Sequence, residues 1–184
     1  MKRDRTKWNK RYSEKTPSLA VPRIVGDYID RAPVGRALDI ACGTGATSLF
    51  LAEKGYAVDA VDISDVALAT CTAQHPAIQG VCADLDTYDL AVGRYCLITN
   101  IRYLNRRLYS QITRALLPGG MLMFETFLKS REKEMDRGFK REYLLDEQEL
   151  PGVFASLDIL FYHESDSGCA ECPPRIASLV GVKP

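Results

Sequence analysis

The sequence predicts an α/β protein in which a mostly parallel sheet is doubly wound between helices. Short apolar runs alternate with segments of helical periodicity from residue 36 to residue 127, which is the pattern of strand–helix–strand units. The runs at 95–101 and 121–127 lack the apolar–polar alternation of strands with one solvent-exposed face. Continuous apolar runs of this kind are typical of parallel strands buried on both faces. The length of 184 residues, with 46% hydrophobic residues, fits one domain over 1–184.

The first part of the chain is expected to be helical and then to enter the sheet. Residues 8–30 predict one or two helices, broken around Thr16 and Pro17, within an N-terminal helical cap at 1–33. Gly55 is placed as the C-terminal cap of one helix, and Ser64 caps the next one. The expected elements up to residue 84 are strand 36–41, helix 46–54, strand 56–62, helix 64–75 and strand 80–84.

The second part continues the alternation and ends in a hairpin. Leu108, Ile112 and Leu116 recur at every fourth residue and predict an amphipathic helix, and residues 118–120 predict a turn into the next strand. Residues 128–145 are crowded with charge, which we interpret as an excursion over the sheet edge, either a lid or a plain solvated segment. The expected elements from residue 95 onward are strand 95–101, helix 105–117, strand 121–127, helix 146–154, and strands 157–164 and 175–183 joined by loop 165–174.

Charge and hydropathy exclude several classes of partner. Lys plus Arg equals Asp plus Glu at 24 each, so the basic excess of a duplex-binding protein is missing and no nucleic-acid partner is expected. No apolar run approaches the roughly 18–20 residues of a membrane span, and no signal peptide is visible, so no membrane association is expected. The sequence makes no prediction of oligomeric state.

Cysteine use indicates the compartment. Six scattered cysteines fit a reducing environment, and we expect a cytoplasmic protein. Cys169 and Cys172 form a Cys-x-x-Cys pair, but with His163 they offer three ligands where a tetrahedral zinc site needs four. We therefore expect no metal, and a redox or structural role for the pair stays open.

A glycine loop carries the chemistry of the sequence. Residues 37–45, Ala-Leu-Asp-Ile-Ala-Cys-Gly-Thr-Gly, end a strand and open a helix. Gly43 and Gly45 let the backbone turn sharply and leave room for a ligand, and the helix N-terminus attracts an anion. Such a loop indicates a nucleotide-type cofactor. The third glycine of the dinucleotide fingerprint is missing, because Ser48 stands at its position.

Three acids narrow the class of cofactor. Asp39 precedes the loop, and a carboxylate there would repel a pyrophosphate by about 1–4 kcal/mol. S-Adenosylmethionine has no phosphate and carries an ammonium that an acid can bind, so Asp39 favours it over NAD. Asp62 lies nineteen positions after Gly43, the spacing at which an acid accepts ribose hydroxyls. Asp84 follows the third strand, where it can reach the adenine; a capping role would explain any one acid, but three at successive strand ends form a ligand site.

These residues resemble the class I S-adenosylmethionine-dependent methyltransferase family, with Ala41 where the family frequently has glycine. The resemblance implies a Rossmann-like doubly wound, mostly parallel seven-stranded sheet with an antiparallel last strand and helices on both faces. It divides the chain into a cofactor-binding core at 34–127 and a closing helix and hairpin at 146–184. The matching segments are 38–45, 58–64, 82–85 and 116–120, and those most similar to the small tellurite-resistance-like methyltransferases are 8–12 and 143–150.

The resemblance implies S-adenosyl-L-methionine as the cofactor and S-adenosyl-L-homocysteine as its product. The residues that it places around the cofactor are Asp39, Ala41, Cys42, Gly43, Gly45, Asp62, Ile63, Asp84, Leu85, Thr99 and Asn100.

The implied reaction is an in-line methyl transfer, for which the protein mainly aligns the reactants. We expect a small-molecule acceptor, because no separate region is large enough to grip a macromolecule. If a proton must leave, Glu125 is the first candidate base and Tyr103 the second, each with a structural alternative. Arg102 and Arg106 are candidates for holding an anionic acceptor, or else for pairing with nearby acids. A non-catalytic cofactor-binding module and an NAD-dependent oxidoreductase are the rival interpretations.

Overall fold

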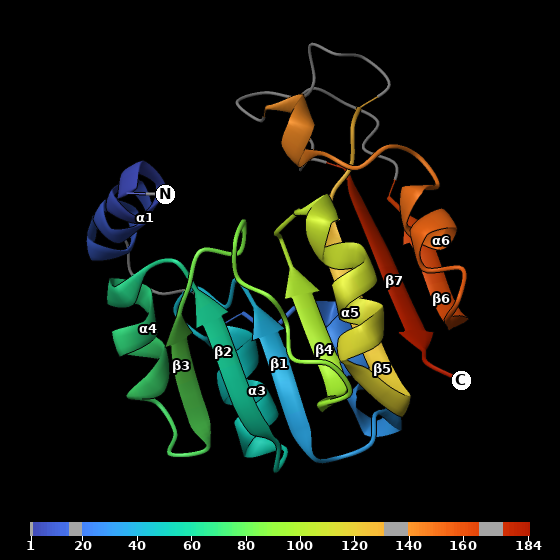
Figure 1. The fold of residues 1–184 in the computed structure, drawn as a ribbon, viewed down its shortest axis with the longest axis horizontal. Coiled ribbons are helices and arrows are strands. Elements are labelled where there is room, and N and C mark those ends of the chain that lie inside the picture. Colours follow the sequence, from blue (N-terminus) through green and yellow to red (C-terminus); the bar gives the residue numbers. More distant parts are fainter. Residues whose placement is uncertain (1, 15–19, 131–139, 166–174) are drawn as a thin grey trace.

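The computed structural model describes residues 2–14, 20–130, 140–165 and 175–184, and it contains one seven-stranded sheet in the order β3-β2-β1-β4-β5-β7-β6 (Figure 1). The strands β1 to β5 are parallel, and β7 runs antiparallel to both of its neighbours. This topology confirms the predicted fold class. The strands are β1 (Arg36–Ile40), β2 (Ala57–Asp62), β3 (Ile78–Cys82), β4 (Tyr95–Ile101), β5 (Leu116–Phe127), β6 (Asp158–Glu164) and β7 (Ile176–Val182).

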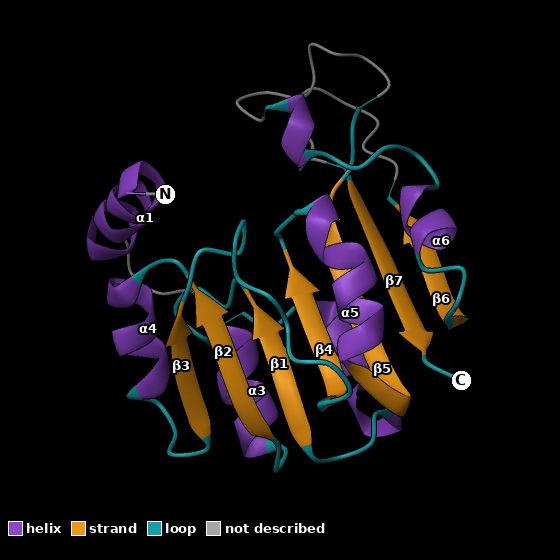
Figure 2. Ribbon diagram, in the orientation of Figure 1, coloured by secondary structure: helices purple, strands orange, loops and turns teal. Residues whose placement is uncertain are grey.

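Helices cover both faces of the sheet, with α5 in front and α3 behind in the view of Figure 2. Each face has its own buried apolar cluster: one joins the sheet to α5 and α6, and the other joins it to α2, α3 and α4. No helix among the described residues is both long enough and apolar enough to span a bilayer. The helices are α1 (Lys2–Glu14), α2 (Arg23–Tyr28), α3 (Ala46–Glu53), α4 (Asp65–Thr72), α5 (Tyr109–Ala115) and α6 (Glu149–Val153), with short 3-10 turns η1 (Ile29–Arg31), η2 (Arg106–Leu108) and η4 (Arg141–Tyr143).

The alternation of side chains along a strand explains how one strand contributes to both buried apolar clusters. Successive side chains of a strand point to opposite faces. In β1, Leu38 and Ile40 pack in the cluster under α5, whereas Ala37 packs in the cluster under α3. Asp39 therefore points toward α3, which places a carboxylate inside an apolar layer.

Several predicted boundaries were wrong by a few residues. The first helix begins at Lys2 rather than near residue 8, and its expected break falls in 15–19, outside the described residues. The strand after α5 begins at Leu116, where a helix and turn were expected, because Leu116 already pairs with Tyr95. Gly119 then adopts φ +75 and the pairing shifts register before residue 121, so the expected turn is an irregularity within the strand.

Two expected features fall largely outside the described residues. Of the charged excursion at 128–145, residues 131–139 are not described, while its ends are joined by an isolated parallel bridge between Leu128 and Leu145. Cys169 and Cys172 lie in 166–174, which is also not described. Among the described residues, no three His, Cys, Asp or Glu side chains gather where they could hold a metal ion.

Candidate functional site

The parallel strands end at one edge of the sheet, and the loop between β1 and α3 turns at that edge in a left-handed conformation. Ala41, Gly43 and Gly45 have φ values of +53, +55 and +88. Only glycine takes this conformation without steric cost, and alanine pays about 1–2 kcal/mol for it. A Cβ on Gly45 would lie 2.4 Å from the Sγ atom of Cys71 in α4, so glycine is required there by packing as well as by dihedral angle.

Asp62, at the end of β2, holds this loop. Its Oδ2 atom accepts a hydrogen bond from the Gly43 N–H at 2.9 Å, and its Oδ1 atom accepts one from the Ser64 N–H at 2.8 Å. Burial raises the pKa of the carboxyl, although the backbone N–H groups oppose that rise. Gln74 donates to the carbonyl of Thr44 at 2.7 Å from the other side. The loop is thus fixed in place by the neighbouring strand and helix, with an acidic side chain beside its glycines.

Asp39 supports the loop from below. Its oxygens accept hydrogen bonds from the hydroxyls of Ser48 in α3 at 2.6 Å and Thr99 in β4 at 2.8 Å. The residue is 2% exposed, and burial raises its pKa to about 6, with the nearby charge of Asp62 adding to the rise. Asp39 and Thr99 were both expected to touch the cofactor. The structure joins them to each other in the core, where both side chains are buried.

Helix α1 brings a further residue to the loop that the sequence did not identify. In Figure 1, α1 lies above α4 at the carboxyl edge of β2 and β3. Arg5 donates to the Ile63 carbonyl at 3.2 Å, and Asn9 bridges Ser64 and Asp65. The Tyr12 hydroxyl lies 2.8 Å from the position of a Cβ on Gly43, and burial raises its pKa to about 12. Residues 5, 9 and 12 lie on one helical face, which is the signal in the sequence that could have indicated this contact.

The turn after β3 lies next along the same edge. Asp84 caps this turn by accepting the Asp86 N–H at 3.0 Å. Asn105 donates to the carbonyl of Leu85, which is buried, at 3.2 Å. Tyr103 packs against this region, and burial, with charge from Asp86 and Asp84, raises its pKa to about 12. Asn105, which also contacts Asp86 and the Tyr103 hydroxyl, therefore groups Tyr103 with the turn at residues 84–86.

Arg102 and Glu125 meet at the ends of β4 and β5. Arg102 has a φ of +58, and its N–H donates to the Glu125 carbonyl at 2.7 Å. Its guanidinium pairs with Glu125 Oε1 at 3.1 Å and lies 5.2 Å from the ring centroid of Phe127. The other oxygen of Glu125 accepts the Ser178 hydroxyl at 2.7 Å. The carboxylate is 8% exposed and the Arg102 side chain 42% exposed, so the cation is the part that faces outward.

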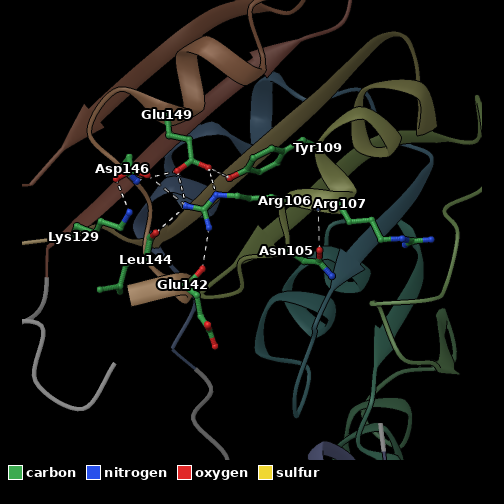
Figure 3. Close-up of polar contacts among 9 residues, drawn as sticks. All are labelled: Asn105, Arg106, Arg107, Tyr109, Lys129, Glu142, Leu144, Asp146 and Glu149. Atoms are coloured by element: carbon green, nitrogen blue, oxygen red, sulfur yellow. Dashed lines mark hydrogen bonds and ion pairs between the residues drawn. The ribbon is translucent and has the colours of Figure 1, made fainter. Parts of the chain in front are cut away.

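Arg106, in contrast, is engaged within the protein, as Figure 3 shows. Its Nε and Nη2 atoms each lie 2.8 Å from an oxygen of Glu149, and it also donates to the carbonyls of Glu142 and Leu144. Glu149 accepts a further hydrogen bond from Tyr109 at 2.7 Å. The guanidinium therefore ties the segment 141–149 to η2 and α5. Asn100, another expected site residue, likewise donates within the chain, to the Tyr103 carbonyl at 2.7 Å.

Comparisons with known proteins agree with this arrangement. A family model described as methyltransferase domain matches residues 37–120. A malonyl-[acyl-carrier protein] O-methyltransferase from Enterobacter lignolyticus (strain SCF1) is 28% identical over 130 residues, which are 68% of this chain and 51% of the relative. The protein YqeM from Bacillus subtilis (strain 168) is 54% identical over 35 residues, which are 19% of this chain and 14% of that protein. The chain thus spans about half of the first relative and less of the second.

Among solved structures, TehB from Haemophilus influenzae has a similar fold. It superposes with a TM-score of 0.79 at 18% identity, covering 96% of this chain and 67% of TehB. At that identity the likeness concerns the fold.

Proposed function

We propose that this chain is a class I S-adenosylmethionine-dependent methyltransferase, which transfers the methyl group of its cofactor to an anionic small-molecule acceptor; the methyltransferase-domain model that matches residues 37–120 supports this. The observation that carries the proposal is the left-handed loop between β1 and α3, fixed by Asp62 and lying over the buried Asp39. The described residues form one sheet and the helices that pack on it, which favours an acceptor small enough to enter at the edge of β4 and β5.

The donor set around the loop fits S-adenosylmethionine rather than a dinucleotide. Asp39 and Asp62 are both buried; burial raises the pKa of Asp39, and the charge of Asp62 adds to that rise. A pyrophosphate would add negative charge next to two carboxylates in a medium of low dielectric constant, whereas the ammonium and sulfonium of S-adenosylmethionine reduce their repulsion. Position 43 also has no room for a side chain, because a Cβ there would contact the Tyr12 hydroxyl. The loop backbone therefore stays open to a ligand.

We assign the cofactor contacts as follows. Gly43 and Gly45 would line the methionine and ribose portion, and Asp62 would accept the ribose hydroxyls with the lone pairs that Gly43 and Ser64 leave open. Asp84 and Leu85 would meet the adenine. Asp39 acts through the loop rather than on the ligand, because its side chain is buried in the layer between the sheet and α3, where Ser48 and Thr99 donate to its oxygens. Tyr12 would close the site from α1.

The cofactor supplies a methyl group on a sulfonium, so the residues of the chain need only hold the acceptor and keep water out. The contacts of Glu125 favour a positioning role over proton abstraction, since both of its oxygens are occupied by Arg102 and Ser178. Tyr103, with a pKa raised to about 12, stays protonated at neutral pH and is a poor base. An acceptor that already carries a negative charge needs neither residue as a base.

Arg102 is the residue that we assign to the acceptor. A non-glycine residue in the left-handed region costs about 1–2 kcal/mol, and such strain is retained mostly at functional sites. Glu125 and Phe127 fix the guanidinium while part of it stays exposed, so its remaining N–H groups can bind an oxyanion. The name of the Enterobacter relative gives that protein, as its acceptor, a malonyl group on an acyl-carrier protein, and a malonyl group carries a carboxylate. We assign to Arg106 the role of holding residues 141–149 in place.

Calorimetric titration and an acceptor assay test the proposal. S-Adenosylmethionine and S-adenosylhomocysteine should bind and NAD should not. With methyl-labelled cofactor and cell extract separated by size and then by anion exchange, label should enter the small anionic fraction. Arg102→Met should reduce that transfer about tenfold or more without changing cofactor affinity, since a hydrogen bond to a charged group contributes about 1.5–3 kcal/mol.

The control variant is Arg114→Met, which removes an exposed arginine at the end of α5 and should leave transfer unchanged. Label found only in protein or nucleic acid would refute a small-molecule acceptor. Cofactor binding without label in any fraction would favour a non-catalytic binding module. We also propose a cytoplasmic location, because the four described cysteines are free thiols, as expected in a reducing compartment.

A further inference from the structure

Arg107, in η2, holds the turn at residues 84–89 that follows β3. Its Nη1 atom donates hydrogen bonds to the carbonyl of Tyr88 at 2.9 Å and to that of Leu85 at 3.3 Å. Its Nη2 atom pairs with the Asp89 carboxylate. Because a guanidinium presents its N–H groups in one rigid plane, these contacts together fix the position and the orientation of the turn.

Asn105 is a second anchor for the same turn. Its side-chain oxygen accepts the Arg107 N–H at 3.1 Å, which orients the amide so that its Nδ2 atom faces the turn. That nitrogen donates to the Leu85 carbonyl at 3.2 Å and to the Asp86 carboxylate at 3.0 Å, and it lies 3.4 Å from the Tyr103 hydroxyl. The Leu85 carbonyl therefore accepts hydrogen bonds from two side chains, which confines the backbone at that point.

Hydrogen bonds inside the turn set the direction of its first peptide group. The Asp84 carbonyl accepts the N–H groups of Thr87 at 3.0 Å and Tyr88 at 2.8 Å. Because the peptide group between residues 84 and 85 is trans and planar, the Leu85 N–H points away from that carbonyl. The direction of this backbone donor therefore depends on the turn keeping its shape.

We propose that Arg107 and Asn105 are positioning residues that make the cofactor site selective for adenine over hypoxanthine. This inference rests on the proposed function, in which Asp84 and Leu85 meet the adenine. The 6-amino group of adenine can donate to a carboxylate, and its ring nitrogen N1 can accept from a backbone N–H. Hypoxanthine reverses both groups, because it has a 6-oxo acceptor and an N1–H donor. A turn held in one place distinguishes the two bases, whereas a loosely held turn can shift to accommodate either.

Arg106 provides a matched comparison in the same element. It lies between the two anchors in sequence, and in Figure 3 its side chain extends away from that of Arg107. Its hydrogen bonds go to Glu149 and to the carbonyls of Glu142 and Leu144 rather than to the turn. Arg106→Met therefore removes a comparable set of hydrogen bonds and leaves the turn anchored.

Calorimetric titration of the full chain with S-adenosylhomocysteine and S-inosylhomocysteine, which differ only in the base, tests the selectivity. The wild-type protein should bind the adenine compound at least about tenfold more tightly, the value of one hydrogen bond to a charged group. In Arg107→Met this ratio of affinities should fall about fivefold or more, the equivalent of one net hydrogen bond. Asn105→Asp keeps the oxygen that caps η2 but replaces the donor with an acceptor, so the ratio should fall there too. Arg106→Met should keep the wild-type ratio.

Amide hydrogen exchange without any ligand tests the anchoring independently of the proposed function. The amide protons of Thr87 and Tyr88, which bond to the Asp84 carbonyl, should exchange about fivefold faster or more in Arg107→Met, because the turn opens more often. Arg106→Met should leave both rates unchanged. Equal rates in the wild-type protein and in Arg107→Met would overturn the proposal.

The calorimetric outcomes are separable. A wild-type ratio that persists in Arg107→Met, or that falls equally in Arg106→Met, would overturn the positioning role. Equal binding of the two compounds by the wild-type protein would also overturn the proposal, because no selectivity would exist to be positioned. Binding of neither compound by the wild-type protein would refute the proposed function, while the exchange rates would still decide whether Arg107 holds the turn.

Discussion

Asp39→Asn should make the protein more stable near neutral pH, although Asp39 is the acid of the sequence motif. The Asp39 carboxyl is 2% exposed, and its pKa rises from an ordinary value of 3.8 to about 6, mainly through burial. One pKa unit corresponds to about 1.4 kcal/mol, so the ionised form costs the folded protein about 3 kcal/mol. Asparagine keeps the shape and removes the charge. Its weaker hydrogen bonds with Ser48 and Thr99 offset about 1 kcal/mol of the gain. We expect a net stabilisation of about 2 kcal/mol at pH 7.5.

The pH dependence gives the sharper test. Because its pKa is raised on folding, Asp39 holds its proton more tightly in the folded than in the unfolded chain. Its contribution to stability is complete below a pH of about 3.8 and is lost as the pH rises through about 6. At pH 4.5 the wild-type chain recovers about 2 kcal/mol of the free energy that the ionised carboxyl costs at pH 7.5. Wild type and Asp39→Asn should then be about equally stable.

Urea unfolding of both proteins without cofactor, at pH 7.5 and 4.5, measures the effect, since other titrating groups cancel in the difference. Asp59→Asn is the matched control: Asp59 is also buried, but it pairs with Arg36 at 2.6 Å and Arg94 at 3.3 Å. That variant should be less stable at pH 7.5, because it leaves two arginines without their partner. If Asp39→Asn were destabilising at pH 7.5, or if its effect were the same at both values, Asp39 would not carry a buried charge.

Three further predictions follow from single contacts. Asp62→Asn should weaken S-adenosylmethionine binding by about 1.5–3 kcal/mol, the value of a hydrogen bond to a charged group; unchanged affinity in calorimetry would remove Asp62 from the site. Gly45→Ala should lower the free energy of unfolding by at least about 2 kcal/mol, because its Cβ would overlap the Cys71 sulfur and φ is +88; a chemical denaturation midpoint equal to wild type would contradict this packing. Arg106→Met should lower the free energy of unfolding by about 1–3 kcal/mol and speed proteolysis within 141–149, because Glu149 loses its partner. Equal digestion rates would refute the anchoring role.

Much of the fold and of the loop is encoded locally, and the sequence could therefore predict it. The period of apolar residues gives strands buried on both faces, and the two glycines mark backbone that other residues avoid. Asp62 follows from the same reasoning, because the end of β2 lies beside the end of β1 in any parallel pair. The strand boundaries were less accurate where the end of a helix and a strand pairing compete for the same residues, as at Leu116.

The partners of the site side chains were decided only by tertiary structure. Arg102 and Arg106 look alike in sequence. Arg106 pairs with Glu149, because α6 packs next to α5, whereas Arg102 stays at the sheet edge. Tyr12 reaches the loop from α1; the spacing of residues 5, 9 and 12 marks one face of that helix, but only the packing of α1 shows that this face meets Gly43.

The glycine loop shows both levels together. By itself the sequence determined that the chain turns sharply after β1 beside an acid, because dihedral preference and strand order are local and topological properties. Only the folded chain decided that Asp39 is buried against hydroxyls and that Cys71 touches Gly45. Both depend on how α3 and α4 pack on the sheet, and packing is a property of the whole core rather than of any segment.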